Sequence, residues 1–221
     1  MDVFDALYTT RAMRRMHPDA IPMDVQGRIL DAAIRAPNGG NTQQWRFVLV
    51  DSVELKAQIG PLYRASMGEL WGRYYSKQIE LAAADPESPE NAAFLRMRRS
   101  AQHLADHFEE IPLLMLAFSR FDPSGGSIFP AVWSAMLAGR AQGIGSTLVT
   151  VLSWSEDQVA ALLQVPQGKH WSLACGVAFG YPRGRWGVAR RQPVNAVAAR
   201  NGWDGDLGLD IPEPLWDGSS S

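Results

Sequence analysis

Arginine residues gather at two places that lie far apart in the sequence. Arg11, Arg14 and Arg15 fall within the segment "TTRAMRRMHP", and Arg190 and Arg191 lie in "ARRQP". A guanidinium stays charged and presents a planar fork of N–H donors that matches the oxygens of a phosphate. Both groups could bind one phosphate only if the fold brings the two ends of the chain together. The alternative is that each group is a solvated surface feature.

A second candidate site lies in the loop "APNGGNTQQW", residues 36–45. Its two adjacent glycines would allow a flat ligand to approach the backbone closely. The side-chain amides of Asn38, Asn41 and Gln43 both donate and accept hydrogen bonds. Such groups suit a heteroaromatic ring that carries donors and acceptors. An ordinary turn of the same composition is the alternative.

Three further patterns give weaker indications of chemistry. The sequence "GIGST" lacks the preceding strand and the third glycine of a dinucleotide-binding loop, because Leu148 occupies that position. His103 and His107 are spaced as metal ligands on a helix, but Leu104 stands where a zinc protease needs Glu, so we expect a solvated helix face. Cys175 is expected to be a buried structural thiol. We therefore predict no metal site and name no nucleophile or general acid.

The composition limits the class of protein. The chain has 221 residues, a formal net charge of -2 and 46% hydrophobic residues, which is typical of a globular domain. The slight acidity argues against a nucleic-acid-binding protein. A single cysteine cannot form an internal disulfide and fits a reducing compartment. We see no signal peptide and no membrane span, and so expect a cytoplasmic protein without a membrane partner.

The order of apolar segments predicts an α+β fold around a central sheet. We expect helices over residues 3–8, 21–37, 62–84, 90–108, 129–142 and 156–165, and strands over residues 45–50, 111–119, 146–152 and 170–180. Asp2 is expected to cap the first helix, and Ser155 with Gln158 is expected to form a capping box for the last one. The alternation in 170–180 favours a strand. We predict one domain over 1–221, with a disordered tail from about 212.

Taken in order, four segments resemble the FMN-dependent nitroreductase family. They are "TRAMR" at 10–14, "APNGGNTQQW" at 36–45, "FPAVWSAMLAGRAQGIGSTLVT" at 129–150, and "GYP" followed by "RRQPV". The resemblance covers nearly the whole chain apart from residues 62–108. It implies a mostly antiparallel central sheet surrounded by helices, with residues 62–108 as a helical lid. It also implies a homodimer with two FMN sites at the interface.

The resemblance assigns roles to particular residues. The FMN phosphate and ribityl chain would be held by Arg11, Ala12, Met13, Arg14, Arg190 and Arg191. The flavin ring would be met by Asn38, Asn41 and Gln43 of the partner subunit, by Gly143, Ile144 and Gly145 near the flavin N5, and by Pro130 and Ala131. Trp71, Tyr74 and Tyr75 would stack on a planar substrate, unless they only pack within a helical hairpin. Thr10, Ala12 and Gln44 depart from the family pattern, and Arg15 is a candidate to replace the missing charge.

The activity that the resemblance implies is a ping-pong oxidoreductase reaction. NADH or NADPH would pass a hydride to the flavin N5, and a nitroaromatic, a quinone or a related aromatic acceptor would then take the electrons. Several alternatives remain open: a reductive dehalogenase, an enone reductase or a flavin-destroying enzyme of cobalamin synthesis on the same fold, a non-catalytic FMN-binding module, or an anion-binding protein without flavin. The sequence does not choose between NADH, NADPH and a deazaflavin donor.

Overall fold

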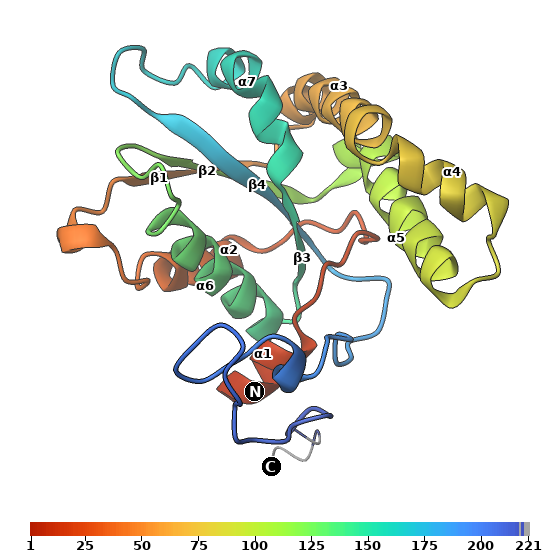
Figure 1. Ribbon diagram of the computed structural model, residues 1–221. Coiled ribbons are helices and arrows are strands. Elements are labelled where there is room, and N and C mark those ends of the chain that lie inside the picture. Colours follow the sequence, from red (N-terminus) through yellow and green to blue (C-terminus); the bar gives the residue numbers. More distant parts are fainter. Residues whose placement is uncertain (217, 219–221) are drawn as a thin grey trace. The chain divides into compact units, whose positions relative to one another are not determined.

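The chain folds into two compact units in the computed structural model, which describes residues 1–216 and 218 (Figure 1). Unit 1 combines Met1–Arg11 with the chain from Trp186 onward. Unit 2 spans Ala12–Arg185 and contains the sheet and most of the helices. Within the described residues, no helix is both long and apolar enough to cross a membrane.

The core of unit 2 is a four-stranded antiparallel sheet. Its strands are β1 (Trp45–Val50), β2 (Leu113–Ser119), β3 (Gly145–Val149) and β4 (Ser172–Gly180), and their spatial order is β1-β2-β4-β3. Each neighbouring pair is antiparallel. The predicted α+β fold with an antiparallel sheet is therefore confirmed, and β1 has the predicted bounds.

The helices of unit 2 pack against both faces of this sheet (Figure 1). They are α2 (Met23–Ala33), α3 (Val53–Glu69), α4 (Ser76–Ala84), α5 (Pro89–Asp106), α6 (Ile128–Ala141) and α7 (Glu156–Leu162), with the short turns η1 (Gly39–Asn41), η3 (Phe108–Glu110) and η4 (Thr150–Ser155) and the π-helical turn η2 (Leu70–Tyr74). Successive side chains of a strand point to opposite faces. Leu114 and Leu116 of β2 accordingly join a cluster with α3 and α5, whereas Leu113 and Met115 join a cluster with α2 and α6.

The strand predicted over 170–180 is confirmed from Ser172 onward as β4. All of β2 is buried, and in β4 only Ser172 is exposed, so helices cover both faces of these strands. The predicted capping box is wrong, because Ser155 does not cap α7. Its hydroxyl lies 3.1 Å from the hydroxyl of Ser66 on α3. A tertiary hydrogen bond therefore replaces the local one that the sequence suggests.

The helical segment after β1 is longer than expected. Helix α3 begins at Val53 rather than at residue 62, and the hydroxyl of Ser52 accepts a hydrogen bond of 3.2 Å from the amide of Leu55. Further on, the expected strand 146–152 ends at Val149 and continues as the turn η4. A local cap at Ser52 therefore begins α3, whereas η4 packs against α3 and β4.

Unit 1 consists of α1 (Val3–Thr9), the turn η5 (Val194–Ala196) and an irregular chain. Asp2 caps α1 as predicted, since its Oδ1 accepts from the amide of Asp5 at 2.8 Å. The side chain of Asn195 holds part of the tail. Its Nδ2 donates to the carbonyl of Leu209 at 2.9 Å, and its Oδ1 accepts from the backbone amide of Ile211 at 3.0 Å. The expectation of a disordered tail falls partly on residues 217 and 219–221, which lie outside the described residues.

Candidate functional site

The arginine-containing segment after α1 extends the sheet of unit 2. The amide of Met13 donates to the carbonyl of Ser146 at 2.9 Å, so the segment pairs with β3. The amide of His17 donates to the carbonyl of Tyr181 at 2.8 Å, just beyond β4. The structure therefore brings Ala12 and Met13 to Gly145, and their contact with a cofactor stays a prediction.

Two facing glycines make room for this segment. Gly145 of β3 lies opposite Gly180 of β4. A Cβ atom on Gly145 would lie 2.9 Å from the Cβ of Met13, and one on Gly180 would lie 2.9 Å from the Cβ of Met16. Any larger residue would push the segment away, so the glycine pair sets where the backbone before and after Arg14 runs.

The guanidinium of Arg14 is half-buried, and among the described residues it has no ion pair with a carboxylate. Burial lowers its pKa, and the nearby Tyr63 acts in the opposite direction. Burial also raises the pKa of Tyr63 to about 12, so the phenol is neutral at physiological pH. A buried charge is costly unless it is paired. The position of Arg14 therefore favours an anionic ligand.

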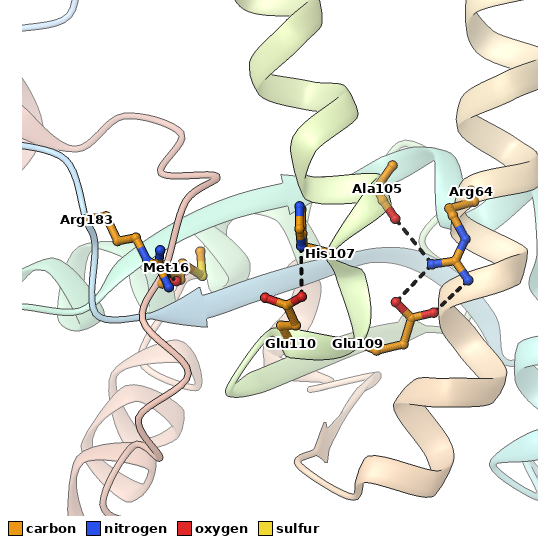
Figure 2. A network of polar contacts seen from close by, with 7 residues as sticks. All are labelled: Met16, Arg64, Ala105, His107, Glu109, Glu110 and Arg183. Carbon is orange, nitrogen blue, oxygen red and sulfur yellow. Dashed lines mark hydrogen bonds and ion pairs between the residues drawn. The ribbon is translucent and has the colours of Figure 1, made fainter.

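Arg14 lies in the wall of a small pocket of about 90 Å³, here called the Arg14 pocket. Its other walls are Met16, His103, Leu104, His107, Glu110, Ile111 and Arg183. Figure 2 shows Met16 and Arg183 facing the pair formed by His107 and Glu110, whose Nδ1 and Oε1 atoms lie 2.8 Å apart. The Nε of Arg183 donates to the carbonyl of Met16 at 3.0 Å.

His103 lies in the wall of this pocket and is half-buried, while His107 on the same helix face is exposed. Its ring centroid is 4.3 Å from that of His107. The spacing of the two histidines indicated a shared helix face, but no local pattern showed that this face meets Arg14. Among the described residues, no group of three or more His, Cys, Asp and Glu side chains could hold a metal ion.

The carboxylate of the neighbouring Glu109 is paired with Arg64 and not with the Arg14 pocket. Arg64 of α3 approaches it with both Nη atoms, at 2.7 Å and 2.9 Å, and its Nη1 also lies 3.4 Å from the carbonyl of Ala105 (Figure 2). Hydrogen bonding to Arg64 lowers the pKa of Glu109. Glu110 is therefore the carboxylate that faces the Arg14 pocket.

The "GIG" turn ends α6 and begins β3. Gly143 has φ of +75°, and the amide of Ile144 donates to the carbonyl of Gly139 at 2.8 Å. Pro130 lies in the first turn of the same helix. At 1.5 Å per residue, Pro130 and Gly143 are about 20 Å apart along the axis. Pro130 and the turn at Gly143, which were both predicted to meet the flavin ring, therefore lie at opposite ends of α6 in one chain.

The amide-containing loop lies at the Pro130 end of α6. The amide of Gly39 donates to the hydroxyl of Ser127 at 3.3 Å, and the amide of Arg120 donates to the carbonyl of Gln44 at 3.1 Å. Asn41 and Gln43 are exposed and adopt left-handed backbone angles, with φ of 52° and 51°. The side chain of Asn38 instead stabilises the loop, because its Oδ1 accepts from the amide of Gln43 at 2.9 Å.

A second hollow of about 580 Å³, here called the Phe121 hollow, adjoins this loop. Its walls include Phe121, with 72% of its surface exposed, and Phe129. Phe121 adopts φ of 56°, which is rare for a bulky residue and marks local strain. Arg120 packs over the ring of Trp171 at 5.1 Å and its Nε donates to the side chain of Gln44. The volume is in the range of small-molecule sites, and no sequence motif indicated it.

The aromatic residues of the predicted lid have different environments. Trp71 is 7% exposed, and its indole N–H donates to Gln102 at 3.1 Å. Tyr75 packs edge-on against Trp71. Tyr74 is 61% exposed, and its ring centroid lies 5.7 Å from that of Trp154. Trp71 thus has the environment that the packing alternative expects, while the stacking of these residues on a substrate stays a prediction.

The remaining predicted cofactor residues belong to unit 1. The amide of Ala189 lies 3.4 Å from the carbonyl of Tyr8, which places Arg190 and Arg191 beside the last turn of α1, close to Arg11. The nearby hydroxyl of Thr10 is buried and, within the part of the chain that is described, has no hydrogen-bond partner. Buried hydroxyls are normally paired. The convergence of this group with Arg14 of unit 2 stays a prediction.

Comparisons with known proteins agree with the fold. The model of the Nitroreductase family matches residues 7–181. A "NADH dehydrogenase" of Thermus thermophilus is 26% identical over 213 residues, covering 89% of this chain and 95% of the relative. A 5,6-dimethylbenzimidazole synthase of Rhodospirillum rubrum is 28% identical over 197 residues, covering 82% and 83%. A crystal structure of iodotyrosine deiodinase bound to FMN and 3-iodo-L-tyrosine superposes with a TM-score of 0.71 at 23% identity, covering 91% and 99%.

Proposed function

This chain belongs to the nitroreductase family, whose members are oxidoreductases, and from that premise we propose that it binds FMN and transfers electrons through it. The observation that supports FMN most directly is the half-buried Arg14, which has no carboxylate partner among the described residues. It lies on a segment that the glycine pair holds against β3 and β4.

The residues present fit a phosphorylated flavin. In unit 1, the phosphate would be held by Arg11, Arg190, Arg191 and the hydroxyl of Thr10, which has no hydrogen-bond partner among the described residues. In unit 2, Arg14 and the backbone of Ala12, Met13 and the turn from Gly143 to Gly145 would hold the rest of the cofactor. Thr10 stands where the family pattern has Arg, so a hydrogen bond from its hydroxyl would replace one ionic contact.

When bound, FMN supplies the ring that accepts and donates a hydride. The role of this chain is to bind and orient it, and to place positive charge where negative charge accumulates on reduction. Arg14 serves that role because a preoriented cation in a partly desolvated site stabilises charge more strongly than one in water. We propose NADH or NADPH as the donor in a ping-pong reaction, and we assign no general acid.

A homodimer would bring the two ring-binding groups together. Within one protomer, Asn41 and Gln43 lie at the Pro130 end of α6, and Gly143 lies about 20 Å away at the other end. We propose that the amide loop of the partner subunit meets the flavin held at the Gly143 end. Trp133 on α6 is 39% exposed and is available for such a contact.

The proposed acceptor is a flat aromatic compound such as a nitroaromatic or a quinone. The Phe121 hollow supports this choice, because it offers two exposed rings and is tied by hydrogen bonds to the amide loop. A dehalogenase, an enone reductase or a flavin-destroying enzyme is the second candidate, since an iodotyrosine deiodinase has the same fold and a 5,6-dimethylbenzimidazole synthase is similar in sequence. We propose that the protein works in the cytoplasm, since its one cysteine is free and buried.

Absorbance spectroscopy tests the proposal. We expect the purified protein to bind FMN with a visible flavin spectrum that is bleached by NADH or NADPH without oxygen and restored by a nitroaromatic. Arg14→Met should weaken FMN binding at least tenfold, whereas Arg96→Gln, an exposed residue of α5, should not change it. A protein that binds no FMN, or that binds it equally well without Arg14, would contradict the proposal.

A further inference from the structure

The Arg14 pocket carries more positive than negative charge. Arg14 and Arg183 contribute two positive charges and Glu110 one negative charge, so the formal sum is one positive charge when both histidines are neutral. Protonation of His103 would raise this sum to two. Arg14 is half-buried beside the buried Leu104 and Ile111, so its charge is screened less than at an open surface. By contrast, Arg183, His107 and Glu110 are exposed.

Every element around His103 contributes a charged or titratable group. Arg14 and Arg15 lie on the segment after α1, Arg183 follows β4, and Asp106 and His107 lie on α5. Glu110 of η3 faces the pocket, while Tyr63 of α3 lies near Arg14. Burial and the neighbouring His107 and Arg15 lower the pKa of His103, so its imidazole is neutral in the empty pocket at physiological pH.

We propose that the Arg14 pocket binds one small oxyanion group, and that His103 takes up a proton when it binds. A volume of about 90 Å³ corresponds to roughly three water molecules, enough for one such group and too little for a whole flavin ring system. The oxyanion can come from the anionic part of FMN or from a free anion. The first source rests on the proposed function, and the second does not.

The coupling follows from electrostatic linkage. An anion in the pocket favours the protonated imidazole of His103, so anion binding raises the pKa of His103, and proton binding raises the affinity for the anion by the same factor. Glu110 holds one imidazole in place through its 2.8 Å contact with His107. Binding that takes up one proton loses up to about tenfold in affinity for each unit of pH increase.

Calorimetry of the FMN-free protein with sulfate tests the pocket alone, because the charge of sulfate is constant in this range. We expect sulfate to bind about ten- to a hundredfold more weakly at pH 8 than at pH 6, with proton uptake that shows as a dependence of the heat on buffer ionisation. His103→Gln should reduce this uptake. His170→Gln is the matched control, since His170 lies outside the pocket and contacts Phe121.

A second set of titrations, with FMN and with riboflavin, identifies the source of the oxyanion. If the FMN phosphate fills the pocket, sulfate will compete with FMN. The affinity for FMN will then decrease as the pH rises, whereas the affinity for riboflavin will not. If a free anion fills it, sulfate will bind to the FMN-loaded protein. Both of these results support the oxyanion site. The oxidised flavin ring is uncharged, so an equal pH dependence with riboflavin and without sulfate binding would overturn it.

The proposal is overturned if sulfate binds without proton uptake, or if His103→Gln leaves the uptake unchanged. It is also overturned if sulfate does not bind and neither flavin shows a pH-dependent affinity. Proton-linked sulfate binding in a protein that binds no flavin would overturn the proposed function and leave the oxyanion site standing.

Discussion

The glycine pair under the arginine segment gives a sharp test of the site, through Gly145→Ala. The added methyl group would lie 2.9 Å from the Cβ and 3.1 Å from the Cγ of Met13, and 3.2 Å from the Cβ of Pro182. Two of these atoms are fixed directly to the backbone, so rotation of a side chain cannot relieve the contact. The segment after α1 or the turn after β4 must therefore move.

Overpacking of this kind costs about 1–3 kcal/mol. For a chain of this size, that cost lowers Tm by roughly 2–12 °C. Because the hydrogen bond from Met13 to Ser146 holds the backbone one residue before Arg14, the displacement also moves Arg14. We expect the affinity for FMN to fall by at least tenfold, beyond what the loss of stability explains.

Thermal unfolding and flavin fluorescence titration measure the two effects. Gly27→Ala is the matched control, because Gly27 is exposed in α2 and a Cβ there meets no atom within 4 Å. In a helix, Ala is more favourable than Gly by about 1 kcal/mol, so the control should be slightly more stable than the wild type. The steric reasoning is refuted if Gly145→Ala has the stability and FMN affinity of the wild-type protein.

Three further predictions concern other parts of unit 2. Lys56 is buried and its Nζ donates to the carbonyl of Ile111 at 2.7 Å. Lys56→Met should lower the free energy of unfolding in urea by about 1–3 kcal/mol, whereas exposed Lys77→Met should leave it unchanged. Burial raises the pKa of Cys175 from 9.0 to about 12. The folded state thus keeps a proton that the unfolded state loses, stability should fall as pH rises from about 9 to 12, and Cys175→Ala should flatten this fall in alkaline thermal scans. Phe121→Gly removes an aromatic wall and should raise the KM for a nitroaromatic roughly 2- to 13-fold in steady-state assays, and an unchanged KM would place the acceptor elsewhere.

Much of the fold could be predicted because it depends on local patterns. The apolar, β-prone run of residues 45–50 is too short for a buried helix and forms β1. Asp2 caps α1 because its short acidic side chain reaches the amide of Asp5. By contrast, the capping role expected of Ser155 fails, because Ser66 of α3 competes for the same hydroxyl.

The candidate site divides in the same way. Arginines, amides and glycines of the right types are visible in the sequence, since charge and hydrogen-bonding capacity belong to the residue itself. The sequence by itself therefore determined which groups are available to bind an anion and a flat ring. Only the tertiary structure decided that Met13 packs over Gly145, that His103 from α5 faces Arg14, and that the two ring-binding groups lie at opposite ends of α6. The physical reason is that these relations depend on distances between segments far apart in the chain, which packing against the sheet sets and no local spacing encodes.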